Sequence, residues 1–182
     1  MRILLIMAAF LSFLGRLLGA EEKPGPKIAP IYQSMRELCL KMDPKAAGAD
    51  PEKPVVALLM EMGFPNGSAT LMVAADSSTS MYFSGGGGII GAGKHAEVKA
   101  AGQEMLSTAT EFLPQFKKTE SFPVPASGMI TFYLVTRDGV LTYSAKEVDL
   151  GEKRDKLSKL FHAGQAVITQ VRLVDEKSKQ KP

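Results

Sequence analysis

Apolar residues recur at every third or fourth position in three segments of this chain, the spacing that places them on one face of a helix. These segments are residues 31–42, 96–116 and 157–171. In the first segment the apolar face holds Ile31, Met35, Leu38, Cys39 and Met42. The charged residues, Arg36 among them, fall mostly on the opposite face. We therefore expect three amphipathic helices, with Cys39 as a core residue.

Other apolar runs are shorter and are separated by turn residues, which is typical of antiparallel strands. The predicted strands are residues 55–64, 69–75, 79–84 and the two arms of 129–146. The turns between them are Pro65-Asn66-Gly67, Asp76-Ser77-Ser78 and Asp138-Gly139. The last pair favours a two-residue type I′ turn, so the pattern predicts a three-stranded meander and a separate hairpin.

The turn at Asp138-Gly139 also predicts the pairing of its two strands, with Thr136 opposite Leu141. One face of this hairpin carries Ile130, Phe132, Leu134, Leu141 and Tyr143, which we expect to be core. The other face carries Tyr133, Val135 and Val140. This second face is more apolar than solvent contact requires, so a helix or a second subunit is expected to cover it. These three residues are a candidate protein interface.

Together the elements predict a single α+β domain over residues 31–174. It would be a two-layer structure with a five-stranded antiparallel sheet and the order α-β-β-β-α-β-β-α. Residues 21–30 contain three prolines and indicate a stiff linker. Residues 175–182 are polar and charged, apart from the final proline, and indicate a disordered tail.

This order of elements resembles the secretion-chaperone-like fold of the type III secretion chaperones, and more loosely the roadblock/longin and profilin groups. The resemblance covers roughly residues 30–173 and rests on element order alone, since the chain carries no sequence motif of these groups. It implies a small, often dimeric, ligandless module that binds peptides or proteins through helix and sheet faces.

Residues 1–20 have two interpretations. Met1-Arg2, an apolar run to Gly15 and the small residues before Glu21 are typical of a signal peptide, although Arg16 falls between the run and the cleavage site. Alternatively the chain starts at Met7, and Phe10, Phe13, Leu14, Leu17 and Leu18 form one face of an amphipathic helix that lies on a membrane or packs on the domain. Export or membrane tethering is favoured over a cytoplasmic protein. The run is short of the ~20 residues of a spanning helix.

The composition argues against several classes of function. The net charge of +3 falls to +1 without residues 1–20, too little to indicate nucleic-acid binding. With one cysteine and two histidines the chain has too few ligands for a structural zinc site and cannot form an internal disulfide. We expect neither a metal nor a cofactor.

Six glycines fall within residues 85–93, between a predicted strand and the clearest predicted helix. The spacing from Gly88 to Lys94 matches a phosphate-binding loop, but His95 stands where a Ser or Thr should hold magnesium. Dinucleotide and nucleotide loops also need a parallel strand–helix–strand unit, which the antiparallel hairpins do not supply. We therefore expect close packing and positive φ angles here, with anion binding by Gly88, Gly91, Gly93, Lys94 and His95 as the alternative.

No catalytic constellation is evident. His95 and His162 are the only histidines, and no Gly-x-Ser-x-Gly motif accompanies them. Glu61 interrupts an apolar strand, so it either faces solvent, which is favoured, or is a buried carboxylate paired with Lys94 or Arg137.

The sequence therefore favours a non-catalytic bacterial protein- or peptide-binding or scaffold domain, with a homodimer as one form of partnership. The alternative is a small-anion or nucleotide-binding protein, or an enzyme, that uses the glycine-rich loop at residues 85–95.

Overall fold

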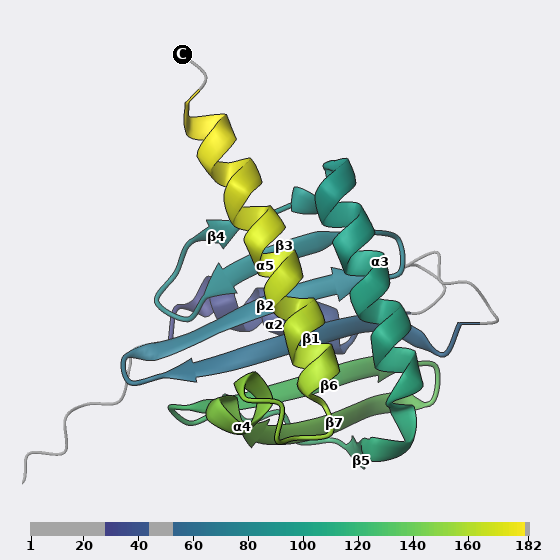
Figure 1. The fold of residues 1–182 in the computed structure, drawn as a ribbon. Coiled ribbons are helices and arrows are strands. Elements are labelled where there is room, and N and C mark those ends of the chain that lie inside the picture. The colour runs from purple at the N-terminus through teal and green to yellow at the C-terminus, as the bar shows by residue number, and fades with distance from the viewer. Residues whose placement is uncertain (1–27, 44–52, 181–182) are drawn as a thin grey trace, which may run out of the picture.

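The computed structural model describes residues 28–43 and 53–180. The predicted signal or membrane-associating segment at 1–20, and most of the predicted linker at 21–30, lie outside these residues. The described residues form a mixed structure of helices packed on one antiparallel sheet (Figure 1). The predicted α+β class with an antiparallel sheet is therefore confirmed.

The sheet has seven strands in the spatial order β4-β3-β2-β1-β6-β7-β5, so the predicted number of five is wrong. The strands are β1 Val55–Phe64, β2 Gly67–Ala74, β3 Thr79–Phe83, β4 Gly88–Ile89, β5 Lys117–Thr119, β6 Met129–Thr136 and β7 Gly139–Lys146. The two predicted hairpin units are present. The additional strands, β4 and β5, have two and three residues, too few to show a hydrophobic period, and they form by pairing with β3 and β7.

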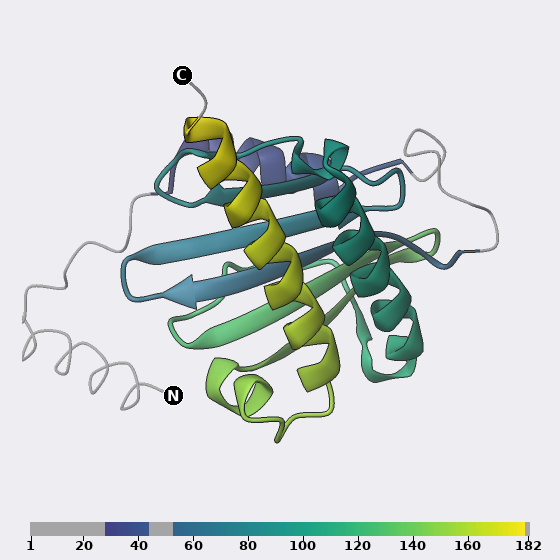
Figure 2. The same ribbon diagram turned by 45° about the horizontal axis from the view of Figure 1, so that its top comes forward.

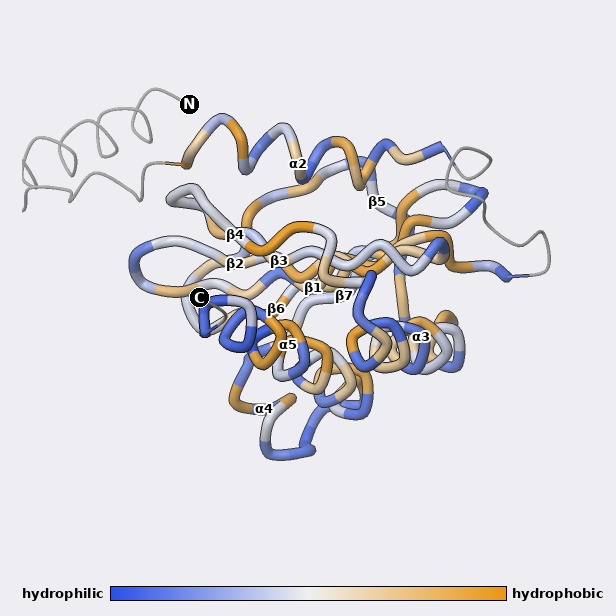
Figure 3. The backbone as a smooth tube through the Cα atoms, turned by 90° about the horizontal axis from the view of Figure 1, so that it is seen from above, coloured by the Kyte–Doolittle hydropathy of each residue, from blue (hydrophilic) through white to orange (hydrophobic). Residues whose placement is uncertain are grey.

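Helices cover both faces of this sheet. The α-helices of the described residues are α2 Pro30–Leu40, α3 Ala96–Glu111, α4 Glu147–Gly151 and α5 Ser158–Lys179, and η1 Ala92–Lys94 and η2 Leu113–Gln115 are short 3₁₀ turns. Figure 3 shows α2 on one side of the sheet and α3 with α5 on the other. The predicted two-layer arrangement is therefore wrong: the domain has three layers.

Strand β1 explains why its sequence is an almost unbroken apolar run. Leu58 and Met60 point into the core beneath α3 and α5, whereas Ala57 and Leu59 point into a second core beneath α2. A strand covered on both faces has no solvent side, so its sequence does not alternate. The unbroken apolar run therefore reflects the burial of β1 on both of its faces.

The hairpin of β6 and β7 has the predicted faces but a different register. Thr136 pairs with Gly139, and Leu134 pairs with Leu141. The predicted pairing of Thr136 with Leu141 is wrong because the loop residues are Arg137 and Asp138, while Gly139 takes the positive φ of 113°. A shift of two residues leaves every side chain on its predicted face.

Helix α2 is rotated from the predicted orientation. Tyr32 and Arg36 are buried, whereas Ile31 and Leu38 are 60% and 68% exposed. The expectation that Ile31 and Leu38 face the core is therefore wrong. Polarity alone would turn Ile31 and Leu38 inward, but the sheet offers hydrogen-bond partners to Tyr32 and Arg36.

Helices α3 and α5 lie side by side across the other face (Figure 2). Their close approach to the sheet depends on two buried glycines, Gly102 next to Val73 and Gly164 next to Met60. Helix α5 continues to Lys179, so most of the predicted disordered tail is helical. Among the described residues, no helix has the length and apolar character that crossing a lipid bilayer requires.

Candidate functional site

The glycine-rich passage folds as a strand connection that relies on backbone freedom. Gly91 adopts a φ of +70°, in the left-handed region that other residues avoid, and its amide donates to Oγ of Ser80 over 3.2 Å. A side chain at Gly93 would overlap the carbonyl oxygen of Ser77. These two positions need glycine for turning and packing, as the sequence suggested.

The five residues proposed to bind an anion do not converge on one cavity. Gly88 lies in β4 and lines an apolar groove, whereas Lys94 and His95 lie at the start of α3, where Lys94 is exposed. Gly91, Gly93, Lys94 and His95 line neither this groove nor the larger cavity beside α3. The first turn of α3 also carries the acidic Glu97, which disfavours an anion there.

The two histidines lie far apart. His95 precedes α3, and His162 is exposed near the start of α5, against the ring of Phe161. An ion pair of 2.6 Å between Glu111 and Lys159 joins the end of α3 to the start of α5, so the helices run antiparallel and the histidines lie at opposite ends. Within residues 28–43 and 53–180 no group of three His, Cys, Asp or Glu side chains is arranged to hold a metal.

Glu61 is fully buried, so the expectation that it faces solvent is wrong. Its partner is Arg36 of α2, rather than Lys94 or Arg137. Nε of Arg36 donates to Oε1 over 2.5 Å, and Nη2 donates to Oε2 over 2.9 Å. Nη2 also donates to the carbonyl oxygen of Pro123, and the guanidinium lies 5.4 Å from the centre of the Tyr133 ring.

Burial and the ion pair shift the pKa of Glu61 in opposite directions, and the same holds for Arg36. Desolvation raises the pKa of Glu61, and hydrogen bonds from Arg36 and Thr70 oppose that rise without cancelling it. Burial alone would lower the pKa of Arg36, but the hydrogen bond and negative charge of Glu61 raise it. Arg36 therefore remains a cation, and its partner is a carboxylate that burial penalises.

Hydroxyl groups complete the contact between α2 and the sheet. The Tyr32 hydroxyl bonds to Ser68 at 3.0 Å and to Thr70 at 2.8 Å. The Tyr82 hydroxyl donates to the sulfur of Cys39 over 3.6 Å, and burial raises the pKa of both groups. These buried groups bond to one another and none reaches solvent, so the cluster fixes α2 on the sheet.

The candidate interface residues Tyr133, Val135 and Val140 are buried in the core beneath α2. One of the two predicted covers, a helix, lies over them, so they do not form an open surface of the described chain. The hydroxyl of Tyr133 donates to the carbonyl oxygen of Pro123 over 2.9 Å.

An apolar groove opens beside the exposed side of α2, between that helix and the strands β3 and β4. Its volume is about 350 Å³. It is lined by Ile31, Tyr32, Met35, Tyr82, Phe83, Gly87, Gly88 and Ile90, and none of these residues is charged. We call it the α2 groove. Three of its side chains are well exposed: Ile31 at 60%, Phe83 at 42% and Ile90 at 60%.

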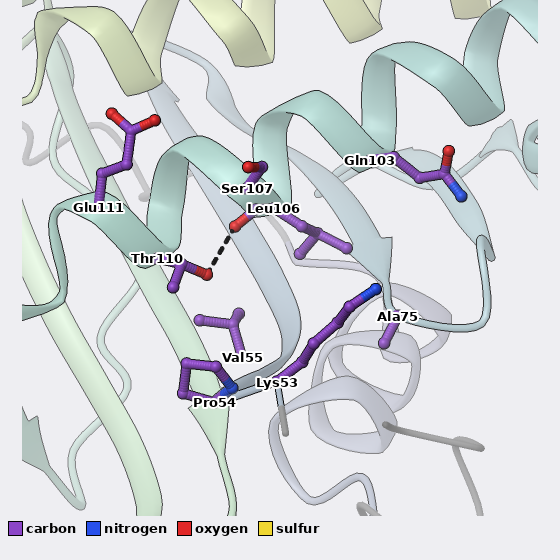
Figure 4. A pocket seen from close by; sticks show the side chains of 9 residues that line it. All are labelled: Lys53, Pro54, Val55, Ala75, Gln103, Leu106, Ser107, Thr110 and Glu111. Atoms are coloured by element: carbon purple, nitrogen blue, oxygen red, sulfur yellow. Dashed lines mark hydrogen bonds between the residues drawn. The ribbon is translucent and has the colours of Figure 1, made fainter. Parts of the chain in front are cut away.

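A larger cavity of about 710 Å³ lies between the start of β1 and the last turns of α3 (Figure 4). Two of the five polar side chains that line it, those of Thr110 and Glu111, are engaged elsewhere. The Thr110 hydroxyl donates to the Leu106 carbonyl oxygen over 3.1 Å, and Glu111 pairs with Lys159. Figure 4 shows the side chains of Gln103, Ser107 and Glu111 pointing in different directions rather than toward one another. The cavity therefore lacks the converging polar groups that fix a small ligand, and the α2 groove is the stronger candidate site.

Sequence reasoning missed the α2 groove. The apolar spacing places Ile31 in the core, whereas it is 60% exposed. The only signal was Ile89-Ile90 among flexible glycines, which did not reveal that Ile90 is exposed. Comparison with protein-family models, with curated proteins and with solved structures gave no match. The element-order resemblance to secretion chaperones accordingly stays an expectation.

Proposed function

We propose that this protein is a non-catalytic binding domain whose α2 groove holds an apolar segment of a protein or peptide. The observation that carries the proposal is the groove itself, which has exposed Ile31, Phe83 and Ile90 on its walls and no charged lining residue. Isolated apolar side chains are common on protein surfaces, but a concave cluster of them is typical of an interaction site. An amphipathic helix laid in such a groove is a recurrent mode of peptide recognition.

The exposure of the three side chains sets the scale of the affinity. Full burial of an Ile or Phe side chain contributes roughly 1.5–3 kcal/mol, and about half of each remains to be buried here. The three together offer roughly 2–5 kcal/mol before the cost of association. We therefore expect weak, reversible binding, with dissociation constants of about 0.2 mM or higher.

A binding role also fits the rest of the chemistry. The buried Arg36–Glu61 pair lies inside the core between α2 and the sheet, where no substrate could contact it. The alternative of anion binding at the glycine-rich loop stays a prediction. Phosphate or nucleotide that raised the melting temperature, with Lys94→Ala abolishing the rise, would support it.

The proposal is tested with a fluorescein-labelled synthetic peptide that carries Leu and Phe at helical spacing. Fluorescence anisotropy should report its binding to the full chain. Ile90→Asp, which puts a charge into the groove, should weaken binding by about tenfold or more. Leu173→Asp is the matched control, because Leu173 is an exposed apolar residue on α5, across the sheet. Equal affinities for the two variants would refute the proposed function.

A further inference from the structure

We propose that the segment held in the α2 groove belongs to this same chain and comprises residues 10–18. The proposal rests on the proposed function and names the partner of that site. Phe10, Phe13, Leu14, Leu17 and Leu18 follow one another at intervals of three, one, three and one residues, which would place all five on one face of a helix. A stripe of this kind is what the walls of the groove can bury.

The path of the chain places this segment within reach. The backbone amide of Ala29 donates to the carbonyl oxygen of Ser84 over 2.7 Å, so the chain joins the domain directly beyond the end of β3. Two residues later Ile31 already forms a wall of the groove. The ten residues from Leu18 to Ile28 can span up to about 33–36 Å. A tether of this length gives an effective concentration on the order of millimolar, which suffices for a weak groove.

The polarity of the segment also matches the groove. In the same helical arrangement Ser12, Gly15 and Arg16 fall on the side opposite the apolar stripe, so the one charge would face solvent. A surface-bound membrane helix typically carries several cations on its polar face, and residues 10–18 contain only Arg16. The single charge and the uncharged concave groove favour docking on the domain over a lipid surface.

Cysteine cross-linking in the full chain tests this docking directly. Leu14→Cys is combined with Ile90→Cys in the groove, or with Leu173→Cys on α5 as the control, and Cys39 stays because it is only 4% exposed. Under mild oxidation the Ile90 pair should form an intramolecular disulfide about tenfold faster or more than the Leu173 pair. Its rate should not change on dilution.

Three results would overturn the docking. The first is that the two cysteine pairs cross-link at equal rates. The second is that the product is a dimer whose yield rises with protein concentration, which would assign the segment to a second copy. The third is that the intact mass of the natural protein lacks residues 1–20. If instead the full chain floats with phosphatidylcholine–phosphatidylglycerol vesicles and the Ile90 pair does not cross-link, the segment belongs to the membrane and the proposal fails.

A second measurement separates this proposal from the proposed function and needs no cysteine. If residues 10–18 occupy the groove, Leu14→Asp should release it and raise the affinity for the added peptide about tenfold or more, whereas Ser12→Asp on the opposite side should not. A peptide that is sensitive to Ile90→Asp but indifferent to Leu14→Asp would refute the docking and leave the proposed function standing. A peptide that binds no variant would refute both.

Discussion

Replacing Arg36 with methionine should leave the Glu61 carboxyl group in the core without its cation. Glu61 has an exposed fraction of 0% and Arg36 of 8%, so water cannot replace the two hydrogen bonds that the substitution removes. Methionine keeps an unbranched apolar side chain of similar reach against the Tyr133 ring. The substitution therefore tests the loss of the Arg36 charge more than the loss of its packing against Tyr133.

The loss of stability in this variant is limited by the cost of protonating Glu61. Breaking a buried ion pair by removing one partner costs about 3–5 kcal/mol. The folded protein can limit that cost by protonating Glu61, whose ordinary pKa is 4.5. Each pH unit above that value adds about 1.4 kcal/mol to the cost of protonation, so at pH 7 the cost is about 3.4 kcal/mol. We expect a loss of about 3–4 kcal/mol at pH 7, which corresponds to a melting temperature lower by roughly 6–16 °C.

The sign of the pH dependence distinguishes this mechanism from simple loss of contact. A carboxyl group whose pKa is raised by folding stabilises the folded state below its ordinary pKa, and this contribution is lost as the pH rises. Burial raises the pKa of Glu61, and Arg36→Met raises it further because the hydrogen bonds and the positive charge of Arg36, which oppose that rise, are gone. The deficit of the variant should therefore be small near pH 4.5 and should grow toward pH 7.

Urea denaturation followed by far-ultraviolet circular dichroism measures the effect, since the chain contains no Trp to serve as a fluorescent probe. The double variant Arg36→Met/Glu61→Leu should recover most of the stability at pH 7 and lose the extra pH dependence. Lys41→Met breaks an exposed pair with Glu37 and should change stability by less than about 0.5 kcal/mol. A deficit that is equal at pH 5 and pH 7, or a double variant as unstable as Arg36→Met, would refute the reasoning.

Two further predictions concern the glycine passage and the tyrosines. Gly93→Ala should lower the free energy of unfolding, measured by urea denaturation, by about 1–3 kcal/mol, because the new methyl group would overlap the Ser77 carbonyl oxygen. Gly85→Ala has open space around the new methyl group and should be neutral or slightly stabilising. Equal effects of the two substitutions would contradict the packing role of Gly93. Burial raises the pKa of every tyrosine above its ordinary 10.0, to about 12 for Tyr133 and Tyr143. Because the folded state holds these protons, its stability should fall as the pH rises above 10, and ultraviolet absorbance at about pH 10.5 should show little tyrosinate until guanidinium chloride is added. Half of the tyrosines ionised in the folded protein at that pH would contradict their burial.

Local sequence was sufficient to predict the hairpins and the three long helices. Turn residues such as Pro65-Asn66-Gly67 act on their immediate neighbours, so their effect can be derived without the rest of the chain. The register of the second hairpin was missed by two residues, because both Arg137-Asp138 and Asp138-Gly139 make acceptable loops. The strands β4 and β5 could not be predicted, since a strand of two or three residues owes its conformation to its partner.

For the glycine passage the sequence predicted close packing and positive φ angles, and Gly93 and Gly91 have these two properties. The buried Arg36–Glu61 pair was not predicted with its true partner, although Glu61 was noted as an anomaly in an apolar strand. These two residues are 25 positions apart, and nothing local indicates that α2 turns its Arg36 side inward.

The sequence by itself determined the three long helices, the five longer strands and the faces of the long hairpin, because each depends on residues a few positions apart. Only the tertiary structure decided that α2 covers the face opposite α3 and α5, which buries Tyr133, Val135 and Val140 within the chain. It also decided the rotation of α2, since two hydrogen bonds to Glu61 and the contacts of Tyr32 outweigh burial of Ile31 and Leu38. That rotation places Ile31 on the wall of the α2 groove. The proposed site therefore exists because Arg36, rather than Ile31, faces the sheet.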